Sequence, residues 1–228
     1  MKKYHKIQTL YERDGRGKIV TQNLTRPIYG TIKDWAVTEK VNGTNIRIGF
    51  TMPYGGCPAV KWELAGRTDT DTPDIPDKLV RHVTGLAVNI SPVVRDIMDG
   101  HGLERYTLYG EGYGAGIHKG GRYRDDNGFI LFDVAVHDLQ MGQLYLSDDV
   151  VTKTAKELDI PRVPLLNSGE TMTIEEIVEL VRYGYASDVA EKFDENFLAE
   201  GIVARPVEPL YDNRKERVMF KLKSSDFD

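Results

Sequence analysis

The sequence predicts one α+β domain, because strand-like segments open the chain, helical segments follow in the middle and strand-like segments return at the end. Residues 35–40 and 46–50 alternate apolar and polar side chains on either side of a polar turn, the pattern of two short strands. Residues 201–205 and 217–223 close the chain with the same period of two. We therefore expect antiparallel sheets, flanked by helices, that meet over a central cleft.

The remaining elements are predicted from local signals. Near the N-terminus, Ile7, Leu10 and Tyr11 are spaced for one turn of helix, and the interior strands are predicted at 59–65, 106–112 and 129–136. Residues 79–86 form one predicted helix, and a second begins at Ser91 as N-cap with Pro92 at its first position and ends near Gly100. Further helices are predicted at 150–158, 174–181 and 188–197, of which the one at 174–181 carries a capping box, Thr173 with Glu176.

Composition limits the class of protein. The 228 residues carry a net charge of −5, with 30 Lys and Arg against 35 Asp and Glu, so a uniformly basic nucleic-acid coat is excluded. Basic residues are concentrated at 118–124 and 214–223, where the alternative interpretation is an ordinary solvated surface. Cys57 is the only cysteine, which excludes an intramolecular disulfide, and no secretory signal or membrane-spanning run is present. We expect a cytoplasmic protein without membrane contact, which a virus or phage could encode.

Two stretches carry residues that an ordinary strand does not require. Lys40 stands at the end of a half-buried strand, and Gly43 allows close approach to the backbone three residues later. In the last strand, alternation places Val218, Phe220 and Leu222 on one face and Arg217, Met219, Lys221 and Lys223 on the other. The cationic face suits an edge strand protected against aggregation, or a clamp for phosphate groups.

Six strings favour the phosphate clamp, because in order they resemble the motifs of covalent nucleotidyltransferases, the ATP-dependent DNA and RNA ligases and mRNA capping enzymes. The strings are Lys40-Val-Asn42-Gly43-Thr-Asn45, Arg67-Thr68, Tyr109-Gly-Glu111-Gly112, Leu131-Phe132-Asp133, Glu200-Gly201-Ile-Val and Lys221-Leu-Lys223. The sequences of these strings are most similar to those of the T4 RNA ligase 2 group, which includes the kinetoplastid RNA-editing ligases. The resemblance implies a nucleotidyltransferase (ATP-grasp-like ligase) domain with ATP in the central cleft.

The resemblance also implies a mechanism. Lys40 would attack the α-phosphorus of ATP, expel pyrophosphate and become lysyl-AMP, with Glu200, Lys221 and Lys223 as the other catalytic residues. A free lysine has a pKa of about 10.4, so the nucleophile needs partial burial and nearby cations, which Mg²⁺ (or Mn²⁺) and the two C-terminal lysines would supply. Glu200 is the expected metal ligand.

Nucleotide recognition follows from the same resemblance. Glu111 is expected to contact the ribose with Arg67 as its partner, and Phe132 to stack on adenine; the alternative for Phe132 is ordinary core packing. Asp133 is either a supporting residue or a strand-end residue. The full set expected to contact the nucleotide is Glu39, Lys40, Asn45, Arg67, Glu111, Phe132, Arg205, Lys221 and Lys223.

The chain departs from the family in two ways. Asn42 stands where this RNA ligase group often has histidine, which leaves open any step assigned to that imidazole. The sequence extends five residues beyond Lys223, so residues 1–228 are expected to be an adenylyltransferase catalytic domain without the C-terminal helical domain or OB-fold of relatives and without motif VI. Such a chain is either a truncated catalytic domain or a naturally minimal enzyme.

The sequence thus predicts an ATP-dependent polynucleotide ligase, an RNA ligase, which adenylylates itself, transfers AMP to a 5′-phosphate and seals with a 3′-hydroxyl. The alternatives are a minimal DNA ligase, a capping guanylyltransferase, and a non-catalytic nucleotide- or RNA-binding module derived from a ligase. Nicked or broken RNA is the expected partner, DNA or an RNA/DNA hybrid the alternative one, and a monomer the expected state.

Overall fold

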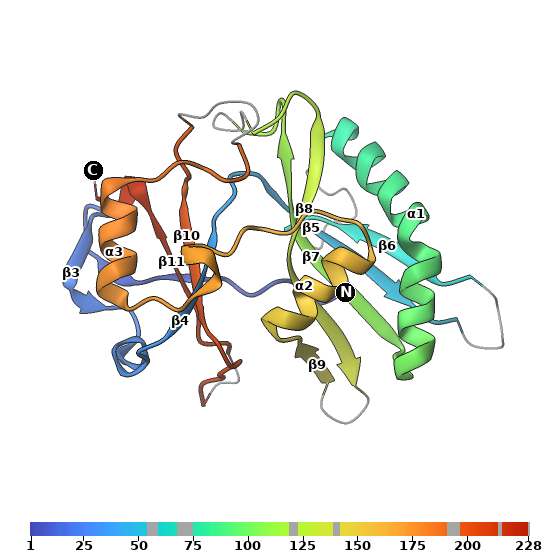
Figure 1. Ribbon diagram of the computed structural model, residues 1–228, viewed down its shortest axis with the longest axis horizontal. Coiled ribbons are helices and arrows are strands. Elements are labelled where there is room, and N and C mark those ends of the chain that lie inside the picture. The colour runs from blue at the N-terminus through green and yellow to red at the C-terminus, as the bar shows by residue number, and fades with distance from the viewer. Residues whose placement is uncertain are drawn as a thin grey trace. The chain divides into compact units, whose positions relative to one another are not determined.

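The computed structural model describes residues 1–53, 59–67, 75–118, 123–138, 142–190, 197–213 and 216–227 (Figure 1). These residues form two compact units. Unit 1 comprises Met1–Tyr4 and Asn42–Arg162, and unit 2 comprises His5–Val41 and Val163–Asp228. The chain therefore passes from one unit to the other between Lys40 and Gly43, inside the stretch that the sequence singles out.

Unit 1 is built on an antiparallel sheet of five strands in the order β6-β5-β7-β8-β9. The strands are β5 (Thr44–Thr51), β6 (Lys61–Ala65), β7 (Arg105–Gly114), β8 (Asn127–Asp138) and β9 (Gly142–Tyr145). Helices α1 (Asp77–His101) and α2 (Asp148–Glu157) pack on one face of this sheet (Figure 1), where they share a hydrophobic core with side chains such as Ile46, Leu108 and Val134. The opposite face is therefore the one on which polar side chains can act.

Helix α1 replaces the two shorter helices predicted for 79–86 and 91–100, and that prediction was wrong. Pro92 lies inside the helix, and the Ser91 hydroxyl donates to the Ala87 carbonyl at 2.6 Å instead of capping a new helix. Proline removes the donor to the carbonyl of Val88, but Val88 is exposed, so water can serve that carbonyl. The apolar stripe continues past Pro92 to Met98, and its packing against the sheet holds the helix together.

Unit 2 contains a four-stranded sheet in the order β1-β11-β10-β4 and a separate β2-β3 ribbon. The strands are β1 (Gln8–Thr9), β2 (Tyr11–Arg13), β3 (Ile19–Leu24), β4 (Trp35–Glu39), β10 (Gly201–Pro206) and β11 (Phe220–Lys223). Helix α3 (Ile174–Tyr183) covers the core face with Ile177 and Val181, and the 3-10 turns are η1 (Pro27–Thr31), η2 (Asn167–Gly169) and η3 (Ser224–Asp226). The capping box of α3 is present, with the Glu176 backbone N–H donating to Thr173 at 3.3 Å.

The helical turn predicted near Leu10 was wrong. Residues 8 and 9 form β1, which pairs in parallel with β11, and the Leu10 backbone donates to the Lys221 carbonyl at 3.1 Å. Leu10 is fully buried in the core of unit 2. Pairing with a strand from the far end of the chain thus overrides the local helical spacing.

Several boundaries also differ from the prediction. The third predicted strand begins at Lys61 rather than at residue 59, and β9 was not predicted. Strand β11 begins at Phe220 rather than 217, and Arg217 and Met219, expected on its exposed cationic face, are buried. The predicted helix at 188–197 falls largely on residues 191–196, outside the described residues.

The fold class is confirmed as α+β, with antiparallel pairing throughout the sheets except between β1 and β11. The two strands flanking the Lys40 turn are confirmed too, but they are not partners: β4 pairs with β10, whereas β5 pairs with β6 and β7. None of the helices in the described ranges has the length and apolar character needed to cross a membrane.

Candidate active site

The sheet of unit 2 brings Lys40 next to the last strand through β10. Lys40 follows β4, and its backbone N–H donates to the Gly201 carbonyl at 2.8 Å, while Gly201 in turn pairs with Lys223 of β11. Because side chains alternate along a strand, Lys40, Arg205, Lys221 and Lys223 share the sheet face opposite the core. The structure therefore brings four of the predicted residues to one surface of one sheet.

Glu200, immediately before β10, joins the nucleophile candidate to the C-terminal lysine. Its Oε2 accepts from the Lys40 ammonium, and its Oε1 lies 2.5 Å from the Lys223 ammonium. All three side chains are partly buried, with exposed fractions of 22% for Lys40, 17% for Glu200 and 34% for Lys223. One carboxylate thus holds two ammonium groups close together on a partly shielded surface.

Gly201 allows the backbones of β10 and β11 to lie close together beside Glu200. Its φ of +151° is a conformation that residues with a side chain rarely adopt, and a Cβ there would overlap the Leu222 carbonyl. Glu200 therefore supplies the carboxylate, and Gly201 is required by the backbone conformation. Each residue of the Glu200-Gly201 string thus has its own role.

Glu39 points the other way. It is 1% exposed, and its carboxylate accepts from the Ser187 hydroxyl at 2.5 Å and from the Val189 backbone N–H at 3.4 Å. Burial raises the pKa of Glu39, while the hydrogen bond from Ser187 acts in the opposite direction. The carboxylate next to the nucleophile candidate is thus engaged inside unit 2, so a contact between Glu39 and a nucleotide would have to come from its backbone.

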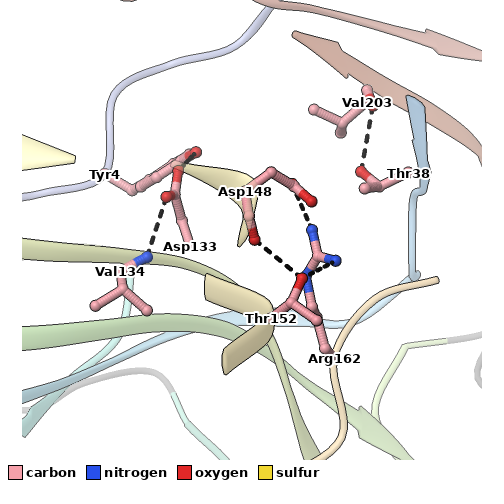
Figure 2. Close-up of polar contacts among 8 residues, drawn as sticks. All are labelled: Tyr4, Thr38, Asp133, Val134, Asp148, Thr152, Arg162 and Val203. Carbon is pink, nitrogen blue, oxygen red and sulfur yellow. Dashed lines mark hydrogen bonds and ion pairs between the residues drawn. The ribbon is translucent and has the colours of Figure 1, made fainter. Parts of the chain in front are cut away.

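Arg205 and Lys221 lie further along the same face. Arg205 pairs with Ala36 of β4 and is 9% exposed, and Lys221 pairs with Val203 and is partly buried. The Val203 carbonyl also accepts from the Thr38 hydroxyl at 3.2 Å (Figure 2), which ties β10 to β4 beside the lysines.

In unit 1, Asn45 and Glu111 are direct cross-strand partners on β5 and β7. Ile46 of β5 and Leu108 of β7 point into the core under α1. Asn45 and Glu111 are one and three residues away from them, so alternation places both on the opposite face, where both are partly buried. The structure thus brings together two of the residues expected to contact a nucleotide.

The turn after Lys40 is held closely against β7. A Cβ on Gly43 would overlap the Gly112 carbonyl and come within 2.8 Å of the Glu111 side chain. The Asn42 backbone N–H donates to the hydroxyl of Tyr123, a fully buried residue, at 2.9 Å. The close approach expected at Gly43 is therefore an approach of backbone to backbone, and no sequence motif marks the contribution of Tyr123.

Phe132 occupies a β-bulge. Tyr109 pairs with Asp133 and Gly110 pairs with Leu131, so Phe132 is the extra residue of β8. Bulges re-aim side chains and occur often beside active sites. Phe132 is partly buried, and the ring of Tyr4 lies 5.0 Å from its ring at an angle of 70°.

Asp133 supports this bulge from within the sheet. It is fully buried, so it is not the strand-end residue considered as an alternative, and it accepts from the Tyr4 hydroxyl at 2.7 Å and from the Val134 N–H at 3.0 Å (Figure 2). Tyr4 also contacts the rings of Tyr109 and Tyr145. The N-terminal segment of unit 1 thus braces Phe132, although no motif in the sequence marks Tyr4.

Arg162 and the residue before it connect strand β8 to helix α2. Figure 2 shows its guanidinium against Asp148 and Thr152 of α2, with a hydrogen bond of 2.8 Å to the Thr152 hydroxyl. The preceding residue, Pro161, accepts from the Leu131 N–H at 2.8 Å. Burial lowers the pKa of Arg162, and the carboxylates of Asp133 and Asp149 oppose that shift.

The remaining predicted residues are less well placed. Arg67 is exposed and follows β6, and its motif partner Thr68 lies outside the described residues. The basic stretch 118–124 is described only at its ends, where Arg124 is paired with Asp126. Of the second basic stretch, Lys221 and Lys223 lie on β11 and Arg217 is buried, while residues 214 and 215 lie outside the described part.

No group of three or more histidine, cysteine or acidic side chains suited to a metal occurs among the described residues. A magnesium ion bound with a nucleotide needs only one or two protein carboxylates, because phosphate oxygens and water complete its shell. Glu200, the predicted ligand, fits that requirement.

Lys40, Glu200, Lys221 and Lys223 thus lie together at one face of one sheet, as the predicted covalent nucleotidyltransferase site requires. Residues 33–223 match the family model for RNA ligase, and the chain belongs to the RNA ligase family.

Solved structures similar to this chain include a Naegleria gruberi RNA ligase mutant with ATP and Mn, at 18% identity and a TM-score of 0.59 over 97% of this chain and 59% of that one. The same RNA ligase with PPi matches at 17% identity and a TM-score of 0.56 over 98% and 62%. Another mutant of it, with AMP and Mn, matches at 16% identity and a TM-score of 0.56 over 97% and 62%. At these identities the likeness establishes the fold. The chain spans about three fifths of the length of those proteins.

Proposed function

We propose that this protein is an ATP-dependent polynucleotide ligase acting on RNA, with Lys40 as its covalent nucleophile. The observation that carries the proposal is Glu200 holding Lys40 and Lys223 together, in a chain that belongs to the RNA ligase family. The ATP and PPi present with the Naegleria gruberi enzyme are the substrate and the leaving group expected for such a first step, and the AMP is the group that Lys40 would carry.

In that first step the Lys40 amine loses a proton, its nitrogen bonds to the α-phosphorus of ATP, and the bond from that phosphorus to the pyrophosphate oxygen breaks. In the resting protein the Lys40 amine is paired with Glu200, so this contact must open before the nitrogen can attack. Lys221 and Lys223 lie on the same sheet face and offset the negative charge that develops on the phosphates. When bound, Mg²⁺ or Mn²⁺ adds positive charge at the phosphate oxygens, with Glu200 as its protein ligand.

We assign nucleotide recognition to the face of unit 1 that carries Asn45 and Glu111, and to Phe132 at the bulge. Glu111 would bind the ribose with Arg67, Phe132 would stack on adenine, and Arg205 with Asn45 would contact the phosphates. Stacking accepts any base, so preference for adenine must come from hydrogen bonds to the edge of the base, for which the backbone beside Glu39 is the candidate.

Two further steps complete the reaction. AMP passes from Lys40 to the 5′-phosphate of an RNA end, and a 3′-hydroxyl then attacks that phosphate and releases AMP. Residues 1–228 would supply the adenylyltransferase domain, of the kind found in the T4 RNA ligase 2 group. A minimal DNA ligase uses the same chemistry, but the Gly43-Thr-Asn45 string and the family match favour RNA.

The test is incubation with ATP labelled at the α-phosphate and Mg²⁺, followed by denaturing electrophoresis and mass spectrometry. We expect one AMP per protein on Lys40, loss of labelling in Lys40→Ala, and full labelling in Lys33→Ala, which removes an exposed lysine of the same unit. AMP on another residue would refute the assignment of Lys40, equal labelling by GTP would indicate a capping enzyme, and no adduct at all would favour a non-catalytic binding module.

A further inference from the structure

Unit 1 contains a cavity of about 310 Å³ at the end of its sheet distant from Asn45 and Glu111. The residues that give it chemical character are Lys2, Arg105, Thr107, His137 and Gln143. None of these belongs to a motif, and the proposed ligase chemistry assigns them no role.

Strand register arranges three of these side chains in a row. Arg105 of β7 pairs with His137 of β8, which pairs with Gln143 of β9, the strand next to β8 (Figure 1). Neighbouring strands lie about 4.8 Å apart, so the three side chains emerge from one face at roughly that spacing. The row therefore presents a guanidinium, an imidazole and an amide to the same small volume.

The cavity is electropositive. Lys2 and Arg105 carry permanent charge, and the described residues that line the cavity include no carboxylate. Within the described part of the chain, none of the ion pairs uses either side chain. Both side chains are exposed, so an anion that enters the cavity can reach them.

His137 supplies a second, independent sign of a ligand. Its Nδ1 is buried and has no hydrogen-bond partner among the described residues. An unsatisfied buried polar atom costs about 1–3 kcal/mol, so a rotation of the ring that brings this nitrogen to a ligand in the cavity would be favourable. A phosphate oxygen suits a neighbouring guanidinium and a ring N–H alike.

We infer that this cavity binds a backbone phosphate of the substrate RNA, away from the site of covalent chemistry. The inference rests on the proposed function for the identity of the strand. Arg105, Thr107 and His137 lie on the same sheet face as Glu111, because β7 alternates without interruption from Arg105 to Glu111. His137 lies five residues further along β8 than Phe132, about 16 Å at 3.3 Å per residue. The phosphate in the cavity therefore belongs several nucleotides from the joined end.

The experiment measures binding of a fluorescently labelled, nicked RNA duplex by anisotropy between about 50 and 200 mM salt. We expect Arg105→Ala to weaken binding about 5- to 10-fold and to reduce the slope of log affinity against log salt by about one unit, because one phosphate contact is lost. Arg105→Lys should retain most of the affinity, and His137→Phe should weaken binding without changing the salt slope by more than a fraction of a unit. The matched control is Arg81→Ala, which removes an exposed arginine from α1, on the other face of the sheet.

Self-adenylylation of the same variants separates this inference from the proposed function. Labelling should be unchanged in Arg105→Ala, because none of the residues assigned to ATP lines the cavity. Equal RNA affinity for Arg105→Ala and Arg81→Ala would overturn the inference while leaving the ligase assignment intact. A weaker ATP interaction in Arg105→Ala, with RNA binding unaltered, would assign the cavity to the nucleotide and also overturn it. Loss of RNA affinity in a protein that forms no AMP adduct would support the cavity and refute the ligase.

Discussion

Replacing Ser187 by alanine is expected to destabilise the protein, because the Ser187 hydroxyl donates to the buried Glu39 carboxylate at 2.5 Å. The other contact to this carboxylate, from Val189, is longer at 3.4 Å, and Glu39 is 1% exposed, so water cannot replace the hydroxyl. A hydrogen bond to a charged group contributes about 1.5–3 kcal/mol. For a chain of this size, that loss corresponds to a fall in melting temperature of roughly 3–12 °C.

The loss of unfolding free energy caused by Ser187→Ala should depend on pH in a defined direction. Burial raises the pKa of Glu39 from the ordinary 4.5, so the folded state binds a proton more tightly than the unfolded state, and stability falls as pH rises from 4.5 through the raised value. The Ser187 hydrogen bond lowers that pKa, so its removal raises the folded-state pKa further. The loss of stability in Ser187→Ala should therefore be smaller at a pH where Glu39 is protonated. It should reach its full value above the folded-state pKa of Glu39 in both the unmutated protein and the variant.

Urea unfolding at about pH 5 and about pH 8 measures both quantities. Ser147→Ala is the control, because the Ser147 hydroxyl makes no capping hydrogen bond to α2 and its loss should change stability by less than about 0.5 kcal/mol. In a Glu39→Gln background, the pH-dependent part of the Ser187→Ala penalty should disappear. A penalty that is equal at both pH values, or larger at pH 5, would refute the coupling of Ser187 to an ionised Glu39.

Three further substitutions test the supports of the site. Gly43→Ala should lose self-adenylylation and about 1–3 kcal/mol of stability, since its Cβ would overlap the Gly112 carbonyl; normal labelling would show that the turn can move away from β7. Tyr123→Phe leaves the partly buried Asn42 N–H without its acceptor and should raise the KM for ATP several-fold with little change in kcat, so an unchanged KM would contradict this role. Thr173→Ala removes the N-cap of α3 and should cost about 0.5–2 kcal/mol in urea unfolding while labelling with AMP stays at the level of the unmutated protein; lost labelling would mean that α3 affects the site.

The elements that the sequence predicted correctly are those whose signals are local. The alternation in β4 and β10 and the capping box of α3 are each contained in fewer than ten residues, and the structure has all three. The shared face of Lys221 and Lys223 also follows from alternation within one strand.

What the sequence did not reveal depends on partners that are distant along the chain. Leu10 lies in extended backbone because β11 is available to pair with it, and Pro92 remains in a helix because the sheet below it holds the apolar stripe. The support of Phe132 by Tyr4 and of Glu39 by Ser187 joins residues 128 and 148 positions apart. Neither tyrosine nor serine has a local pattern that marks it for such a role.

The strand order β1-β11-β10-β4 has a consequence for the order of events during synthesis. The nucleophile candidate is synthesised about 160 residues before its backbone partner Gly201 and the carboxylate of Glu200. Most of unit 1 lies between them as one continuous segment, Asn42–Arg162, and can fold first, since domains generally fold as units as the chain emerges. Lys40 is therefore made well before the neighbours that could orient it, and its contacts with Gly201 and Glu200 form only after β10 has joined β4 in one sheet.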